Sequence, residues 1–153
     1  MIFITMIGMI FLVEYYVKKH MDNVRTLQEQ RRIAKGRVIL KKYYNTGAAG
    51  NFLSSHPDCV RNIHVFALVL VFAALFAIWP RKHAAAAKTG LSFLAAGGLS
   101  NLYDRFSKGY VVDYVSFGFG PKRFRKLVFN LADFFIFAGI ALCTVQFMKK
   151  EGN

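Results

Sequence analysis

The sequence predicts an all-α membrane protein, a bundle of four transmembrane helices with a small β-containing region in the first loop. Of the 153 residues, 55% are hydrophobic and 16% are aromatic, and the mean hydropathy is +0.33. This composition is too apolar for an ordinary soluble domain. The apolar residues gather in four runs of about membrane-spanning length. The polar stretch between the first two runs contains the β-branched and aromatic residues that are typical of strands.

The four apolar runs and the loops between them define a single integral membrane domain. The run at the N-terminus has neither a basic leader nor a small-residue cleavage site, so we expect it to be retained as a helix. The third run is rich in glycine, alanine and serine, which favours close packing inside the bundle. Four crossings place both termini on one side and both longer loops on the other. Within the domain, 1–153, the expected spans are 1–17, 63–80, 84–103 and 127–148, and the extramembrane loops are 18–62 and 104–126.

The two longer loops differ in what their residues predict. Residues 38–53 of the first loop suggest a strand or two that lead into a tight turn at 45–50. Taken alone, the NTGAAG of that turn is most simply a surface turn. In the loop 104–126, three glycines and Pro121 exclude a continuous helix. We expect a loop there, with at most a short amphipathic turn.

The formal net charge of +13 first suggests nucleic acid as a partner. However, the lysines and arginines lie between the apolar runs, and no nucleic-acid recognition motif accompanies them. Membrane lipids are therefore the expected partner, and nucleic acid is not. Ten of the 21 bases lie from Lys18 to Arg61 and six from Arg105 to Lys126. By the positive-inside rule alone, this count would place that face of the protein in the cytoplasm.

Neither cysteine nor histidine predicts a metal site or another cofactor. Cys59 lies just before an apolar run and Cys143 lies inside another one, so a disulfide is not expected. The four histidines show neither an HExxH motif nor another paired ligand spacing. A zinc site is therefore disfavoured.

Glu14 and Lys18 lie near the end of the first apolar run and are four residues apart. They share one face of a helix, with the acid on the N-terminal side, which is the better orientation for an ion pair. The simplest interpretation is a pair that anchors the helix at the membrane interface.

Three aspartates, Asp104, Asp113 and Asp133, lie beside or within the apolar segments. An ionisable group at membrane depth is costly and must face a cavity, a partner or water, so these carboxylates are candidates for a functional site. Asn101 stands three residues before Asp104, and Asn130 stands three residues before Asp133. On a helix this spacing places each asparagine on the same face as its aspartate.

Two of these carboxylates, if they meet, would share one proton, because both cannot ionise cheaply. Such a pair can activate a water without a metal, and peptide hydrolysis is the natural reaction. A purely structural role is hardest to assign to Asp133, since it lies about four residues, roughly 6 Å, inside its apolar run. For Asp104 an ion pair with Arg105 or Lys108 is the simpler interpretation. A small proton-coupled transporter or channel, and a scaffold held by small-residue packing, remain as alternatives.

Four motifs carry a resemblance to a known family. NTGAA, GGLSNLYDR, GYVVDY and FNLADFFIFAG occur in this order and together resemble the lipoprotein signal peptidases, also called signal peptidase II. The resemblance implies a membrane aspartic endopeptidase that removes signal peptides from diacylglyceryl-modified bacterial prolipoproteins by cutting before the lipidated cysteine. It implies Asp113 and Asp133 as the catalytic pair. The positions that it implies for support and substrate binding are Asn45, Gly47, Asn101, Asp104, Arg105 and Asn130.

The same resemblance implies a multi-pass protein of the bacterial cell membrane with its active site at the extracytoplasmic face. This orientation is the opposite of the one that the count of lysines and arginines predicts. We adopt the orientation that the resemblance implies. We expect a monomer without a cofactor. The chain departs from the family pattern at two places. Gly50 follows NTGAA where the family usually has phenylalanine. Glu14 and Lys18 keep the spacing of the family's aspartate and lysine, but with a longer acid.

Overall fold

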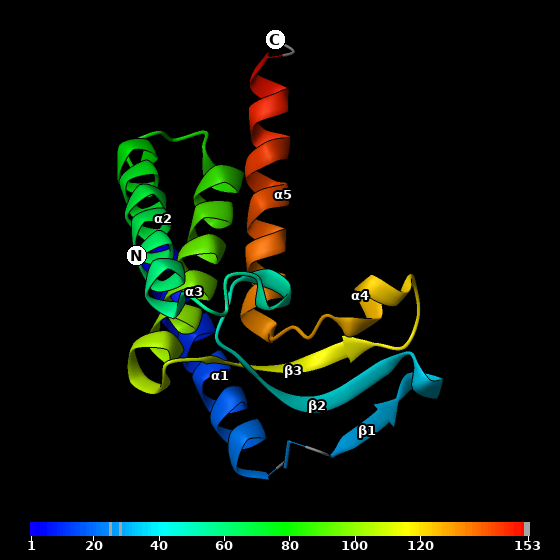
Figure 1. Ribbon diagram of the computed structural model, residues 1–153. Coiled ribbons are helices and arrows are strands. Elements are labelled where there is room, and N and C mark those ends of the chain that lie inside the picture. Colours follow the sequence, from blue (N-terminus) through cyan, green and yellow to red (C-terminus); the bar gives the residue numbers. More distant parts are fainter. Residues whose placement is uncertain (25, 28, 152–153) are drawn as a thin grey trace.

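Four long helices stand side by side in the computed structural model, which describes residues 1–24, 26–27 and 29–151 (Figure 1). The helix α3 occupies the middle of the group and packs against the other three. Its buried residues are mostly glycine, alanine and serine, which confirms the prediction that the third apolar run lies inside the bundle. The long helices are α1 (Ile2–Val24), α2 (Pro57–Ile78), α3 (Ala85–Lys108) and α5 (Leu131–Glu151).

The helices form where the four apolar runs predict them, but their ends differ from the predicted ends. The helix α1 continues past residue 17 to Val24, and α3 continues past residue 103 to Lys108. Gly109 ends α3 in the left-handed conformation, with φ 82°. Pro57 begins α2 before residue 63, because proline suits the first turn of a helix. The helix α5 begins at Leu131, not at residue 127.

Within the described residues, two helices are long and apolar enough to cross a membrane. They are α2 over Pro57–Ile78 and α5 over Leu131–Met148. Large apolar side chains point outward from both, including Phe66, Phe76 and Phe147. This exposure suits contact with lipid and does not suit the core of a soluble protein. Two of the four predicted spans thus pass this test of length and composition.

A three-stranded antiparallel sheet runs across one end of the helices (Figure 1). Its strand order is β1-β2-β3. The two strands of the first loop confirm the predicted β region, and a short 3-10 turn, η1 (Ala34–Gly36), joins them. A register shift between Leu40 and Tyr43 interrupts the pairing of β2 with β3. The strands are β1 (Gln30–Ile33), β2 (Val38–Asn45) and β3 (Val111–Phe117).

The prediction for 104–126 is right in excluding a continuous helix and in allowing a short helical turn, and wrong in expecting no strand. This segment completes α3, supplies β3 as the third strand and adds a short helix, α4 (Lys122–Lys126). The β region is therefore not confined to the first loop. The β3 sequence VVDYVSF has the β-branched and aromatic residues of a strand. The flanking glycines and the central acid led the prediction towards a loop.

Glycine allows α3 and α5 to approach very closely. A Cβ added at Gly139 would lie 2.6 Å from the Gly90 carbonyl oxygen. One added at Gly97 would lie 2.6 Å from the Ala132 carbonyl oxygen. This backbone-to-backbone contact is typical of small-residue packing in membrane proteins. It fixes the start of α5 against the middle of α3.

Substituting Gly139 by alanine should push α3 and α5 apart, because the backbone of Gly90 cannot easily move away from the added Cβ. Overpacking of this kind costs about 1–3 kcal/mol. We expect a lower thermal unfolding midpoint for the detergent-solubilised protein, measured by circular dichroism. Gly8→Ala is the control, since a Cβ at Gly8 meets no atom within 4 Å and alanine favours a helix. Equal midpoints for the two variants would contradict this account of the packing.

Candidate active site

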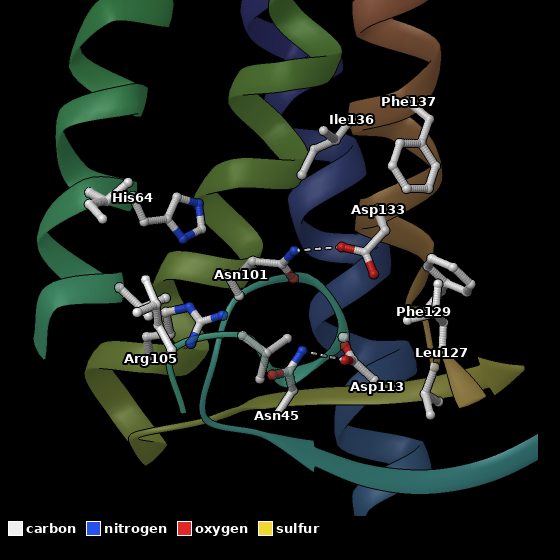
Figure 2. Close-up of a pocket in the computed structure, with 17 residues that line it drawn as sticks. Asn45, His64, Asn101, Arg105, Asp113, Leu127, Phe129, Asp133, Ile136 and Phe137 are labelled. Carbon is white, nitrogen blue, oxygen red and sulfur yellow. Dashed lines mark hydrogen bonds between the residues drawn. The ribbon is translucent and has the colours of Figure 1, made fainter. Parts of the chain in front are cut away.

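A cavity of about 340 Å³ lies between α2, α3 and α5 at the end where the sheet crosses the helices (Figure 2). Apolar side chains form most of its wall, and a polar group of asparagine, aspartate and arginine side chains lies at one end. Its lining residues are Asn45, Ala48, Gly50, Leu53, Val60, Ile63, His64, Asn101, Arg105, Val111, Asp113, Leu127, Val128, Phe129, Asp133, Ile136 and Phe137.

Asp113 reaches the cavity from β3, where it pairs with Tyr43 of β2. It is buried, and both of its carboxylate oxygens accept hydrogen bonds. Oδ2 accepts one from the Asn45 amide at 3.0 Å, and Oδ1 accepts one from the Asn130 amide at 2.7 Å. Two amide donors thus fix the orientation of this carboxyl group.

The pKa of Asp113 is raised from 3.8 to about 7, first by burial and then by the negative charge of Asp133. Asp113 is therefore about half protonated near neutral pH. The pKa of Asp113 is higher in the folded protein than in the unfolded chain. The stability that its protonated form contributes is therefore fully present at a pH below 3.8, the pKa of the unfolded chain. That contribution is lost as the pH rises through about 7.

Asp133 lies in the first turn of α5, at the start of the helix. Its Oδ2 accepts a hydrogen bond from the backbone N–H of Asn130 at 2.9 Å, while Asn130 Oδ1 accepts one from the Asp133 N–H at 3.0 Å. This reciprocal pair caps the helix. The other oxygen, Oδ1, accepts a bond from the Asn101 amide at 3.0 Å. Asp133 thus lies in the first turn of α5 and not about 6 Å along a helix, because α5 begins at Leu131, after the start of the apolar run.

Asn130 connects the two aspartates. Its amide donates to Asp113 while its backbone N–H donates to Asp133. The amide also donates to Asn101 Oδ1 at 3.0 Å. Asn130 is fully buried, and the two carboxylates that it binds line the same cavity (Figure 2). Of the two spacings noted in the sequence, that of Asn130 and Asp133 gives a direct hydrogen bond, whereas Asn101 donates to Asp133 on another helix.

The NTGAAG segment is a structural part of this cavity, so its interpretation as a simple surface turn is wrong. Asn45 and Gly47 are buried. Arg105 donates to the carbonyl oxygens of Thr46 at 3.3 Å and Gly47 at 2.5 Å. The Gly47 N–H donates back to Asn45 Oδ1 at 3.1 Å, which orients the amide that contacts Asp113. A side chain at Gly47 would collide with the carbonyl oxygen of Phe52.

Gly50, the position of the departure from the family pattern, lies in the short 3-10 turn η2 (Ala49–Asn51) and lines the cavity. Its φ of 67° is in the left-handed region that favours glycine. The next large side chain, Phe52, is 68% exposed. At Gly50 the cavity wall is therefore formed by the backbone and not by an aromatic side chain.

Asp104 is a buried support for the site and does not line the cavity. Its Oδ1 lies 3.1 Å from the Lys108 ammonium group, which confirms the predicted pairing. Its Oδ2 lies 3.1 Å from Lys18 and also accepts a hydrogen bond from the Val112 N–H at 3.3 Å. Asp104 therefore ties α3 to α1 and to β3.

The interpretation of Glu14 and Lys18 as an anchor at the membrane interface is wrong, because both are almost fully buried. Lys18 donates to Asn101 Oδ1 at 2.8 Å and to Ser100 Oγ at 3.1 Å. It lies farther from Glu14, at 3.8 Å. Since Asn101 also contacts Asp133, Lys18 supports the carboxylate site from behind. A charged pair within an apolar helix was the signal for this role.

Tyr114 is a site residue that the sequence did not predict. Its hydroxyl donates to Glu14 Oε2 at 2.9 Å and accepts from the Leu131 N–H at 3.0 Å. Burial, and then the Glu14 carboxylate, raise the pKa of Tyr114, which keeps the hydroxyl a donor. This one group joins α1, β3 and α5. Its only signal was its place next to Asp113.

No group of three or more histidine, cysteine, aspartate or glutamate side chains gathers as a metal site in the described part of the chain. The cavity instead presents two aspartates whose ionisation is coupled. That arrangement is suited to acid–base chemistry on a water molecule.

A family model described as signal peptidase (SPase) II matches residues 2–149, which include every residue of this site. The chain belongs to the signal peptidase II family. Its members are membrane aspartic proteases, in agreement with the two buried aspartates at one cavity. The family resemblance of the four sequence motifs is thereby confirmed.

Curated relatives of this signal peptidase II homologue are lipoprotein signal peptidases. That of Buchnera aphidicola subsp. Schizaphis graminum is 29% identical, over 98% of this chain and 93% of the relative. That of Aeromonas hydrophila subsp. hydrophila is 36% identical, over 71% of this chain and 65% of the relative. For the first curated relatives that it matches, the chain spans less than two thirds of their length, from 40% to 65%.

A solved structure has the same fold. It is a bacterial membrane enzyme determined by the in meso method at 2.3 Å resolution, with a TM-score of 0.81 and 21% identity. The match covers 97% of this chain and 88% of the other. The signal peptidase II homologue thus has a mainly helical membrane-enzyme fold with a small three-stranded antiparallel sheet.

Replacing Tyr114 by phenylalanine should destabilise the protein, because it leaves the partly buried Leu131 N–H without its acceptor and removes a donor from the buried Glu14. Such a loss costs about 1–3 kcal/mol. We expect a lower unfolding midpoint than for Tyr16→Phe, which removes the same hydroxyl from a side chain that is 64% exposed. Equal midpoints in a thermal melt would show that the Tyr114 hydroxyl does not join these elements.

Proposed function

We propose that this chain is a lipoprotein signal peptidase that removes signal peptides from diacylglyceryl-modified prolipoproteins, with Asp113 and Asp133 as its catalytic pair. The observation that carries this proposal is that Asn130 binds both carboxylates at one cavity. Membership of the signal peptidase II family supports the same activity. No cofactor enters the reaction.

In the proposed reaction, water is placed between the two carboxyl groups. Asp133 takes a proton from the water as its oxygen attacks the scissile carbonyl carbon, while protonated Asp113 gives its proton to the carbonyl oxygen. The intermediate collapses when the carbon–nitrogen bond breaks. The leaving amine takes the proton from Asp133, and a hydroxyl of the intermediate returns one to Asp113. Both carboxyl groups are then restored.

The raised pKa of Asp113 supports this division of roles, since Asp113 can still hold a proton near neutral pH. The other polar groups hold the pair in place. Asn45 and Asn101 each donate to one carboxylate, and Arg105 with Gly47 shapes the turn that carries Asn45. Asp104 acts from behind, through Lys18.

The cavity wall suits an apolar substrate that arrives from the bilayer. Ile63 on α2 and Ile136 and Phe137 on α5 line it, and these are the two helices apolar enough to span a membrane. We infer that the prolipoprotein enters between α2 and α5. Its acyl chains then stay in lipid while the bond before the lipidated cysteine reaches Asp113 and Asp133.

We also propose that α1 and α3 cross the membrane, which gives four spans with the active site at the extracytoplasmic face of the bacterial cell membrane. The 23 residues of α1 extend about 35 Å, enough to cross about 30 Å of hydrocarbon. Its charged Glu14 and Lys18 point into the protein and are partnered there, as such groups must be in a membrane. Within this single domain the site is complete, so a monomer is sufficient.

The variants Asp113→Asn and Asp133→Asn should each lose cleavage of a purified diacylglyceryl prolipoprotein by at least about 100-fold, since each removes one side of the acid–base pair. Product formation would be followed by gel shift. Asp58→Asn is the matched control, because its side chain is 78% exposed and its one ion pair among the described residues is with Arg61. Normal cleavage by either site variant would refute the assignment. Proton flux into liposomes without cleavage by the unmodified protein would favour a proton-coupled transporter instead.

A further inference from the structure

The β1–β2 hairpin and α4 carry an excess of positive charge. From residue 30 to 57 and from 114 to 132 the sequence has ten lysines and arginines and no aspartate or glutamate. Four of them, Lys122, Arg123, Arg125 and Lys126, fill α4, and all four are exposed. The others lie on β1, β2 and the turn between them. This segregation of charge is not expected from chance mixing on a surface.

Most of these bases have no acidic partner within the protein. Lys42 pairs with Asp22 at 3.5 Å. The other nine form no ion pair with any residue in the described ranges. The bases near the site behave differently, since Lys18 and Lys108 both contact Asp104. Like charges gathered on one surface favour the binding of an anionic partner from outside the protein.

The position of α4 indicates what that partner is. The sheet runs across the ends of the helices, and α4 lies on the side of the sheet from which α5 rises (Figure 1). A row of aromatic contacts leads from Phe124 of α4 through Phe129 to Phe137 of α5. Phe137 is 52% exposed on a helix that can span a membrane. The bases of α4 therefore lie where the apolar surface of α5 begins.

We propose that α4 and the β1–β2 hairpin form a basic platform that binds anionic phospholipid headgroups beside the cavity. The platform is defined by the exposed lysines and arginines of these two segments. Its charge complements lipid phosphate, and its aromatic residues suit the interface between water and hydrocarbon. This inference does not depend on the proposed catalytic activity.

The platform also borders the site. Leu127 directly follows the last base of α4 and lines the cavity. Anionic lipid bound to the platform would hold the sheet, and Asp113 on it, against the membrane surface. It would also explain why sixteen of the 21 bases fall in the two sequence stretches from Lys18 to Arg61 and from Arg105 to Lys126.

Lipid composition near the platform can be measured with a single tryptophan. The chain has one tryptophan, Trp79, at the other end of α2. Phe119, which is 52% exposed beside α4, can replace it in a Trp79→Phe, Phe119→Trp variant. In phosphatidylcholine vesicles, brominated phosphatidylglycerol should quench this tryptophan about twofold more than brominated phosphatidylcholine at the same mole fraction. The ratio should fall towards one in about 1 M salt, which screens surface charge.

In the variant whose single tryptophan is at position 119, the further substitutions Lys122→Gln, Arg123→Gln and Arg125→Gln should bring the ratio of quenching by the two brominated lipids near one in low salt. The charge-conserving Lys122→Arg, Arg123→Lys and Arg125→Lys variant should keep it. The control is the protein that keeps Trp79 and Phe119. Introducing the three glutamines there should not change the ratio of Trp79 quenching by the two brominated lipids. Equal quenching by the two lipids, or enrichment that survives both high salt and the glutamines, would overturn the proposal. Equal quenching with salt-sensitive binding of a polyglutamate peptide would assign the platform to an acidic polypeptide instead.

Discussion

The hydrogen bonds of Asn130 to two aspartates are the interaction on which the rest of the structure depends. Asp113 comes from a strand and Asp133 from the start of a helix, and their negative charges repel. One buried asparagine supplies a donor to each of them. Because its bond to Asp133 also caps α5, the start of the helix and the geometry of the site are fixed together. The pairing of β3 with β2 then brings Asn45 to the other side of Asp113.

The buried charges around this pair are supported in two directions. Behind it, Lys18 contacts both Asn101 and Asp104, so a cation from α1 stabilises the helix α3 that faces the aspartates. Beside it, Arg105 binds the backbone of the turn that orients Asn45. An unpaired charge at such depth would be very costly. The small residues between α3 and α5 allow these polar groups to meet, because they let the two backbones approach within contact distance.

The helices and the two aspartates of the site could be predicted from the sequence, whereas the helix ends, the third strand and Tyr114 could not. Apolar runs locate the helices, but helix ends such as Val24 and Lys108 project beyond the apolar run and leave no hydropathy signal. The aspartates were identifiable because charge in an apolar context is rare. The third strand was missed, since GYVVDYV has a strand-like composition but sits among glycines. Tyr114 was not predictable, because its role depends on Glu14 and Leu131, which lie far away in sequence.

The central claim is that Asp113 and Asp133 share one proton near neutral pH. Infrared spectroscopy of the protein labelled with ¹³C in its aspartate side chains measures this directly, since protonated and ionised carboxyl groups absorb at different frequencies. We expect one protonated aspartate at pH 6, absent from the Asp113→Asn variant, that ionises near the pKa of about 7. Its pKa should fall in Asp133→Asn, where the neighbouring negative charge is gone. Full ionisation of every aspartate at pH 6 would contradict the account.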